Sequence, residues 1–499
     1  MTESNGALSH NWDYEVDVLV AGSGNGGMSA AVAAARTGAS TLVIEIDSAT
    51  GGSSAMSGGG IRIGGANSYE EYLEVTHGMH DPAFSRAYFD GYLEYTAWLK
   101  SIGAAVRPGT QPGIDIWMGT TPGAPSEPQC REYFDSMERL FADAGGTLLL
   151  KTRARKILTD ERGSIVGLTA RRWTTSPDEE DGQIINIKAR NIILSMGGFQ
   201  NNKELCTRYI SPEADMISAV GSPYHRGEGM ILGQEVGAGL SKSMSGIYGS
   251  YMSAFPARRP MENITQWRQA TDADKTDLFN LLFFNTPPGF IAVNLNGKRY
   301  VDEGEIRYRV AQATARQPRA TGVMIFDEAM YSEIVDLRMP EPGTGASEGE
   351  KFATRERLEG EVLFKFDSIE ALADHFGKVG PNQIYRANLL KTIEENNRAA
   401  DAGDPNLEFY RSELRKIATP PFYAWPFTAG VVYTMGGLAI NTTAQVLDQQ
   451  GLPIPGLYAS PPCAGGVFRD YYAGSIASAG TFGWIAGNHA AKRVQKLRN

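Results

Sequence analysis

The sequence has little cysteine, no long apolar run and no excess of positive charge. Its three cysteines stand far apart among 499 residues and form no CxxC pair. This spacing argues against a disulfide framework or a zinc site and fits a reducing cytoplasm. No stretch of about 18 apolar residues is present to span a membrane, and the polar first residues lack the apolar core of a signal peptide. We therefore expect a cytoplasmic protein that does not cross a membrane.

The charge balance narrows the class of partner. The chain carries 47 Lys and Arg against 57 Asp and Glu, a formal net charge of −10. Such a balance disfavours nucleic acid and anionic membranes as partners. The only close histidine pair, His77 and His80, has no cysteine or carboxylate cluster beside it, so we expect no metal site.

Glycine, by contrast, is abundant, with 57 residues, and its first cluster lies in "VLVAGSGNGGMSAAVAAARTGASTLVIE". The apolar run 18–21 predicts a buried parallel strand, and the alanine-rich segment after it predicts a helix. Between them, Gly22, Gly24 and Gly27 form GxGxxG, in which the glycines allow a tight turn, a close approach to pyrophosphate and helix–strand packing. Glu45 ends the next predicted strand, where a carboxylate can bind ribose hydroxyls. The pattern predicts a dinucleotide site.

Later segments favour FAD over a nicotinamide cofactor. "GGSSAMSGGGIRIGG" follows the second strand as a loop of small residues, which can lie flat against a large planar ring. A nicotinamide dehydrogenase would continue here with another β-α-β unit. "IILSMGGF" is an apolar strand that ends in a double glycine, and "TMGGL" and "PGLYAS" follow before a closing helix of small residues.

These motifs resemble those of the fumarate reductase and 3-ketosteroid dehydrogenase superfamily of FAD enzymes. The double glycine Gly51-Gly52 and the segments 195–199, 434–438 and 455–460 occur in the family's order and cover nearly the whole chain. Some relatives attach FAD through a histidine after the double glycine, but Ser53 and Ser54 stand there in this chain. The resemblance therefore implies non-covalent FAD.

The resemblance also implies the fold and the cofactor contacts. The expected fold class is α/β, with a Rossmann-type FAD-binding domain in two pieces, 12–285 and 420–499, that includes a β-meander. An α+β substrate domain, 286–419, is inserted between them. His225 is expected to pack near the cofactor. The expected cofactor-binding residues are Gly22, Ser23, Gly24, Asn25, Gly26, Gly27, Glu45, Ile46, Gly52, Ser53, Ser54, Ser57, Gly58, Gly59, Gly60, Ala154, Ser195, Met196, Gly197, Gly198, Asn201, Ser460, Ser475 and Ile476.

Two adjacent residues compete for the catalytic proton. In the family's fumarate reductases, an arginine after an "RFxNE" segment donates a proton, whereas in its ketosteroid dehydrogenases a tyrosine abstracts one. Here "RYVDE" is followed by both Arg307 and Tyr308. On an extended chain these two side chains point to opposite sides, so only one is expected to face the flavin.

The remaining positions favour the tyrosine. A small dicarboxylate needs cationic partners when it is buried. The reductases provide a histidine before "TMGG" and a C-terminal arginine, but this chain has Tyr433 before the motif and Arg469 next to an aspartate. In the ketosteroid dehydrogenases a C-terminal tyrosine and a backbone amide bind the ketone oxygen. Tyr471 or Tyr472, with the amide of Gly474, is the corresponding pair here.

We therefore expect an FAD-dependent dehydrogenase that introduces a C=C bond next to a ketone of an apolar cyclic substrate such as a 3-ketosteroid. Tyr308 would take the proton, which requires its pKa to fall from about 10, and an external acceptor would take the electrons. The alternative is a fumarate-reductase-like enoate reductase with Arg307 as the proton donor. A flavoprotein that only carries electrons is disfavoured, because the chain has no haem or ferredoxin-like cysteine motif.

Overall fold

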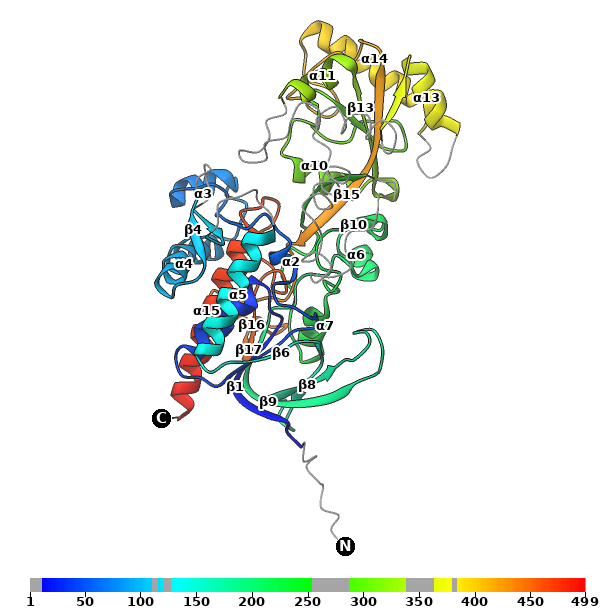
Figure 1. Cartoon of the computed structure of the whole chain (residues 1–499). Coiled ribbons are helices and arrows are strands. Elements are labelled where there is room, and N and C mark those ends of the chain that lie inside the picture. The colour runs from blue at the N-terminus through cyan, green and yellow to red at the C-terminus, as the bar shows by residue number, and fades with distance from the viewer. Residues whose placement is uncertain are drawn as a thin grey trace.

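A computed structural model describes residues 11–109, 115–120, 127–253, 287–337, 363–378 and 384–498. The chain forms two lobes, and the long strand β15 (Phe422–Thr434) runs from one into the other (Figure 1). The first and the last described helices lie side by side in the lower lobe, so both ends of the sequence contribute to the same half of the molecule.

The lower lobe is built on a mainly parallel sheet. Its strand order is β16-β17-β9-β1-β2-β6, and every neighbouring pair from β17 to β6 is parallel. β2 and the last residues of β1, β9 and β17 are buried apolar runs, as is typical of parallel strands covered on both faces. Their bounds are β1 (Tyr14–Ala21), β2 (Thr41–Ile44), β6 (Thr147–Leu149), β9 (Gln183–Leu194), β16 (Gln445–Leu447) and β17 (Pro453–Ala459).

A β-meander and a set of helices complete this lobe. The hairpin β7 (Thr152–Thr159) and β8 (Ile165–Arg172) continues antiparallel into β9, which confirms the predicted meander. The α/β class expected from the sequence is likewise confirmed. The helices are α1 (Asn25–Ala35), α2 (Gly52–Ala55), α3 (Tyr69–Val75), α4 (Pro82–Ser101), α5 (Glu127–Asp143), α6 (Lys203–Tyr209), α7 (Glu228–Glu235), α15 (Ser475–Arg498) and the 3-10 turn η1 (Ala214–Met216).

Small residues allow α1 and α15 to pack closely. A Cβ atom on Gly483 would lie 2.1 Å from the Gly26 carbonyl oxygen, and one on Gly487 would lie 2.3 Å from that of Ala30. Both approaches are too short for any side chain, so only glycine fits at these positions. The alanines of α1 are likewise buried. This contact holds the beginning of α15 next to the glycine loop.

The small-residue segment 51–65 differs from the flat loop expected from the sequence. It contains a single helical turn, α2, and the short strand β3 (Gly60–Ile61), which joins β5 (Ile116–Met118) and β4 (Val106–Pro108) in a three-stranded sheet. Gly51 and Gly52 have φ of 112° and 47°, values that glycine adopts readily and that allow the chain to turn into α2.

The upper lobe has its own sheet and its own hydrophobic core. The sheet follows the order β10-β15-β13-β12, and β11 and β14 also pair with β15. Apolar residues of β12, β13, β15 and α14 form a second cluster, separate from the core of the lower lobe. The assignment of residues 286–419 to a separate substrate domain remains a proposal. The bounds are β10 (Ser218–Ala219), β11 (Ile247–Ser253), β12 (Ile291–Val293), β13 (Thr321–Asp327), β14 (Phe364–Phe366), α10 (Arg307–Thr314), η2 (Pro318–Ala320), α11 (Glu328–Leu337), α13 (Ile369–Lys378) and α14 (Arg386–Ala402).

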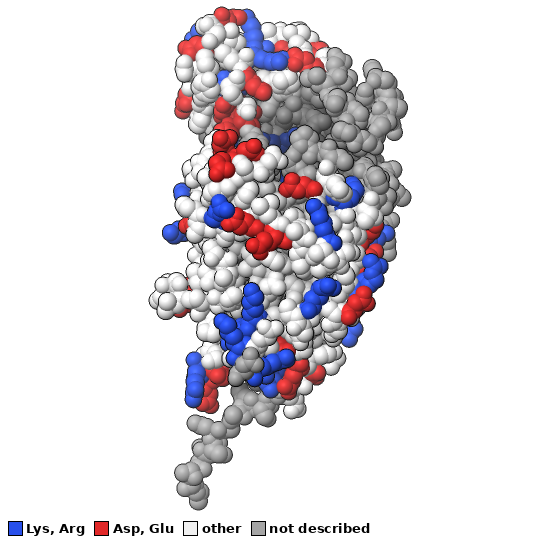
Figure 2. All heavy atoms as spheres, turned by 90° about the vertical axis from the view of Figure 1, so that its left-hand side faces the viewer, with Lys and Arg blue, Asp and Glu red and all other residues white. Residues whose placement is uncertain are grey.

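The surface matches the charge balance of the sequence. Figure 2 views the side on which α3 and α4 lie, and acidic and basic side chains are interspersed over that face. This is the pattern of a solvated surface. Within the described ranges, no helix combines the length and the apolar character that crossing a bilayer requires.

Candidate active site

A cavity opens where the parallel strands end. The wall comes from the carboxyl ends of β1, β2 and β9, from α2, and from the N-terminal turns of α1 and α15. Open parallel sheets bind ligands at this edge, because strand ends and helix N-termini converge there.

The three motif glycines have three distinct environments. Gly22 has φ of 97°, and a Cβ on it would lie 2.3 Å from the Ser195 carbonyl oxygen. A Cβ on Gly27 would lie 1.9 Å from the Gly22 oxygen, so this residue fixes the helix against the turn. Gly24 is the N-cap of α1, and its Cβ would meet only Gly51 and Ser54, both at 3.8 Å. Gly24 therefore leaves room for a ligand, and the first amides of α1 are available to a pyrophosphate.

The open space in front of Gly24 gives a direct test of where the cofactor binds. Gly24 has φ of −61° and ψ of −177°, which alanine also adopts, so Gly24→Ala should fold. Its methyl group would occupy space in front of the helix N-terminus, and we expect FAD affinity to fall on the order of tenfold or more. Flavin fluorescence titration of the apoprotein measures this change. Gly377→Ala in α13, whose Cβ meets ordinary contacts beginning at 3.4 Å, is the matched control and should bind FAD normally. Unchanged affinity in Gly24→Ala would contradict the assignment.

Glu45 lies at the expected end of β2 and lines the cavity. Its Oε2 accepts hydrogen bonds from the Ser23 amide at 2.8 Å and the Ser23 hydroxyl at 2.6 Å, and its Oε1 accepts one from the Asp47 amide at 2.8 Å. Burial raises the carboxyl pKa, and these three donors oppose that rise. A carboxylate held in this way has acceptor capacity left for ribose hydroxyls.

Most of the cofactor-binding residues expected from the sequence lie together on the cavity wall. These are Gly22, Ser23, Gly24, Asn25, Gly26, Glu45, Ile46, Gly52, Ser53, Ser54, Ser57, Ala154, Ser195, Met196, Gly197, Ser475 and Ile476. The remaining ones, which do not line it, are Gly27, Gly58, Gly59, Gly60, Gly198, Asn201 and Ser460.

Several of the residues off the wall support it from behind. Gly59 faces the Cys130 sulfur, and a Cβ on Gly198 would strike the Thr434 hydroxyl at 2.2 Å. Ser460 shares a hydrogen bond of 2.8 Å with Ser195, which is itself on the wall.

Other residues of the wall were not in the expected cofactor-binding set. They are Ala21, Ile44, Thr152, Ser222, Tyr224, His225, Glu228, Val432, Tyr433, Pro461, Pro462 and Ala479. Pro461 and Pro462 directly follow Ser460, an expected cofactor-binding residue, and this position in the sequence was a usable signal for them.

His225 lies on the wall, near the cofactor as expected, and is held as a neutral ring. Burial lowers its pKa to about 4. Gln200 donates to its Nδ1 at 2.8 Å, so the ring proton is on Nε2, which lies 3.4 Å from the Ser53 hydroxyl. His225 therefore presents a hydrogen-bond donor at the cavity wall rather than a charge.

A cluster of tyrosine side chains lies next to the cavity wall. Tyr472 stacks on Tyr248 with ring centroids 3.5 Å apart, and Tyr433 and Tyr308 lie 6.1 and 6.3 Å from Tyr472. The Tyr472 oxygen accepts the Ser475 amide at 2.7 Å and shares a second hydrogen bond with the Ser475 hydroxyl. Because Tyr433 and Ser475 line the cavity, this cluster adjoins the expected flavin position.

The two competing residues do not lie on an extended chain, so that expectation was wrong. Arg307 and Tyr308 are the first two residues of α10, and Ile306 is its N-cap. Consecutive helical side chains are about 100° apart, so the two still face different surroundings. Arg307 is exposed, whereas Tyr308 is 6% exposed and lies 5.4 Å from Tyr248 between ring centroids.

The tyrosine environment does not lower any pKa toward neutrality. Burial raises the pKa of Tyr308, and the hydrogen bond from the Tyr472 amide only partly opposes the rise. Burial also raises the pKa values of Tyr433 and Tyr472. All three groups are therefore protonated phenols at neutral pH. A tyrosine that acts as a base at neutral pH would need a lowered pKa instead.

Of the two C-terminal tyrosines, Tyr472 is the one that faces the cluster. Tyr471 lies between the ring of His77, at 4.2 Å, and the guanidinium of Arg309, at 5.1 Å. Gly474 has φ of 96°, and its carbonyl oxygen accepts a hydrogen bond from Tyr88. As expected, Arg469 contacts its neighbouring aspartate, at 3.3 Å, and its side chain is 65% exposed.

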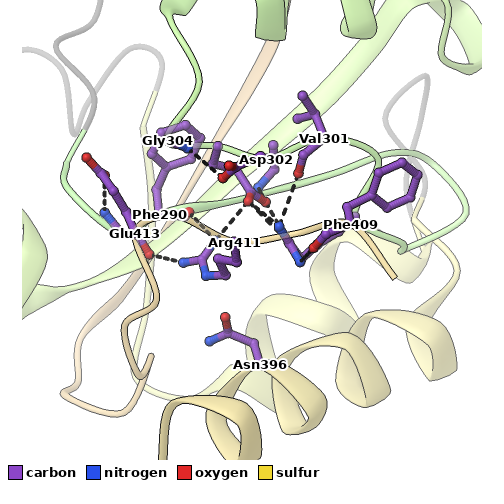
Figure 3. Close-up of polar contacts among 12 residues, drawn as sticks. Phe290, Val301, Asp302, Gly304, Asn396, Phe409, Arg411 and Glu413 are labelled. Carbon is purple, nitrogen blue, oxygen red and sulfur yellow. Dashed lines mark hydrogen bonds and ion pairs between the residues drawn. The ribbon is translucent and has the colours of Figure 1, made fainter. Parts of the chain in front are cut away.

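A buried ion cluster fixes the segment that leads into α10. The Glu303 carboxylate contacts Arg299 at 2.6 Å and Arg411 at 2.9 Å, and all three side chains are almost fully buried. Arg411 also donates to the carbonyls of Phe290 and Gly289. Figure 3 shows Arg411 among these contacts, above the helix α14 that carries Asn396. Glu303, the last residue of "RYVDE", lies four residues before Arg307. Through Arg411, the cluster connects this segment to the chain around residue 411 and to the carbonyls of Gly289 and Phe290.

Known proteins resemble this chain in sequence and in fold. A family model described as an FAD binding domain matches residues 17–478. The chain is 28% identical to a probable fumarate reductase of Shewanella frigidimarina and 29% identical to a urocanate reductase of Eggerthella lenta, each over 96% of this chain and 75% of the relative. Among solved structures, a 3-ketosteroid-Δ4-(5α)-dehydrogenase from Rhodococcus jostii RHA1 superposes with a TM-score of 0.68 at 24% identity, over 97% of this chain and 98% of that one.

Proposed function

This chain belongs to the FAD-binding family matched above, and from that premise we propose that it is an FAD-dependent oxidoreductase that reduces a C=C bond conjugated to an electron-withdrawing group. Its relatives by sequence are named as reductases, which favours the enoate-reductase alternative over the desaturation of a ketosteroid. The likeness to a ketosteroid dehydrogenase, at 24% identity, supports the fold alone.

The observation that carries the proposal is the buried, protonated phenol of Tyr308. Reduced FAD, when bound, supplies hydride to one alkene carbon, and the other carbon needs a proton. A buried phenol with a raised pKa is protonated at neutral pH and can donate a proton there. In this step the Tyr308 O–H bond breaks, its electron pair stays on oxygen, the substrate carbon takes the proton, and solvent reprotonates the phenolate.

The position of Tyr308 supports it over its neighbour. Its ring is buried against Tyr248 and Tyr472, in the cluster that reaches the cavity wall through Tyr433. Arg307, by contrast, is exposed at the first residue of α10. We therefore propose Tyr308 as the proton donor. The enoate-reductase alternative is retained, with its donor changed from Arg307 to Tyr308.

The groups around the cluster favour a substrate with one carbonyl or carboxylate. Tyr433 and Tyr472 are neutral donors, suited to one ketone or carboxylate oxygen. Two buried carboxylates would need cationic partners. The candidate for that role, Arg469, is largely exposed and paired with an aspartate. We propose enones or monoenoates as the substrate class.

An anaerobic flavin titration tests the direction of the reaction. Purified holoprotein is reduced, then mixed separately with cyclohexenone, cinnamate and fumarate while flavin absorbance is followed. We expect rapid reoxidation by the enone or the monoenoate and slow or no reoxidation by fumarate. Oxidised protein receives a saturated 3-ketosteroid in a parallel set. Bleaching by the steroid, without reoxidation by any enoate, would overturn the reductase proposal in favour of desaturation.

A further inference from the structure

One peptide group beside the cavity is hydrogen-bonded on both sides. The carbonyl oxygen of Tyr471 lies 2.7 Å from Nε2 of His80. The amide of the same peptide unit, the N–H of Tyr472, donates to the Tyr308 oxygen at 3.3 Å. His80 and the proposed proton donor, Tyr308, are thus hydrogen-bonded to opposite sides of the same peptide group.

The partners of His80 fix its protonation. A carbonyl oxygen only accepts, so Nε2 must carry the ring proton. The other nitrogen, Nδ1, lies 2.9 Å from the hydroxyl of Tyr72, which therefore donates to it. His80 is 5% exposed, and burial lowers its pKa, although the hydrogen bond to the Tyr471 carbonyl and the nearby Asp470 oppose this. The ring of Phe468 covers it at 5.5 Å.

These contacts form one directed chain of hydrogen bonds. It runs from the Tyr72 hydroxyl to His80, from His80 to the Tyr471 carbonyl, and from the Tyr472 amide to the Tyr308 oxygen. A hydrogen bond accepted by a peptide carbonyl polarises the group and strengthens its N–H as a donor. The chain connects α3 and the segment before α4 with α10.

We propose that His80 is a positioning residue for the proton donor: through the Tyr471–Tyr472 peptide it orients the Tyr308 hydroxyl and stabilises the phenolate that remains after proton transfer. The inference rests on the proposed function only for its catalytic consequence. The link between His80 and the ionisation of Tyr308 is a property of the protein alone, and it can be measured without substrate.

The test measures the ionisation of Tyr308 directly. The protein is labelled with 3-fluorotyrosine, and the Tyr308 resonance is assigned by its absence in Tyr308→Phe. Its chemical shift is then followed with pH. In His80→Leu, which removes the donor to the Tyr471 carbonyl, we expect the midpoint to rise by about one pH unit. In His80→Gln, whose side-chain amide can replace the Nε2 donor, the midpoint should stay within a few tenths of wild type.

A neighbouring variant separates hydrogen bonding from loop movement. His77 stacks on Tyr471 with φ of 51°, a conformation that asparagine tolerates, and no hydrogen bond joins it to the peptide among the described contacts. His77→Asn should leave the midpoint unchanged. An equal rise in His77→Asn and His80→Leu, or no rise in His80→Leu, would overturn the proposal.

Activity then reports the catalytic consequence. With the best acceptor found, His80→Leu should lower kcat about tenfold with little change in KM, and His80→Gln should restore most of it. A midpoint shift without any loss of kcat would keep the hydrogen-bond link and remove Tyr308 from the proton-transfer step. That result would contradict the proposed function but not the hydrogen-bond link between His80 and Tyr308.

Discussion

Replacing Tyr308 with phenylalanine should lower the rate of alkene reduction by roughly 10²- to 10⁴-fold, the usual contribution of a positioned proton donor. The phenylalanine ring keeps the contacts with Tyr248 and Tyr472, so FAD should remain bound and the visible flavin spectrum should be unchanged. Stopped-flow reoxidation of the reduced protein by the preferred acceptor measures the effect on the chemical step.

The pH dependence follows from the direction of the Tyr308 pKa. A proton donor must be protonated, and burial raises this pKa above its ordinary value of about 10. The rate should therefore be constant through neutral pH and fall only on the alkaline side, above the raised pKa. Tyr308→Phe should lack this alkaline limb. Arg307→Ala is the neighbouring control and should lose less than tenfold. The reverse pattern, a large loss in Arg307→Ala and none in Tyr308→Phe, would restore arginine as the donor.

Replacing Glu303 with leucine should lower the free energy of unfolding by about 3–5 kcal/mol. The carboxylate lies between Arg299 and Arg411, whose side chains are 7% and 1% exposed, so its removal leaves two buried cations without a counter-charge. The backbone carbonyls that both arginines contact carry only partial charges and cannot replace it. Urea unfolding, followed by intrinsic fluorescence, measures the loss.

A matched pair on the surface isolates the effect of burial. Glu394 contacts Arg398 one turn away on α14 at 2.7 Å, and both side chains are 70% exposed. Glu394→Leu makes the same chemical change in water, where ion pairs contribute little, so stability should hardly change. Equal losses in the two variants would show that burial of the Glu303 cluster has no special weight. A loss confined to Glu303→Leu would identify the cluster as a support of the segment that precedes α10.

The residues that the sequence assigns to the nucleotide half lie together on the cavity wall because their signals are local. Turn, strand and helix follow one another between Val18 and Glu45, so their residues meet in space as well as in sequence. The role of Gly27 in packing α1 also followed from the motif spacing alone.

The substrate end was harder to predict because its contacts are between distant segments. The Tyr308 oxygen accepts a hydrogen bond from the amide of Tyr472, which is 164 residues away in the sequence. Tyr248, which stacks on Tyr472, belongs to no recognised motif. Whether a tyrosine pKa rises or falls depends on burial and on neighbouring charges, which a single sequence does not supply. The conformation at Arg307 was missed because tertiary packing decides the start of so short a helix.

The cavity wall joins the two ends of the described chain. The Asn25 side chain donates to the Ile476 carbonyl at 2.8 Å, and the N-terminal turns of α1 and α15 both line the cavity. During synthesis on the ribosome, residue 25 emerges long before residue 476. FAD therefore cannot meet its complete binding site on a nascent chain that lacks α15. We therefore expect the complete wall of the cavity to form only after α15 has been translated.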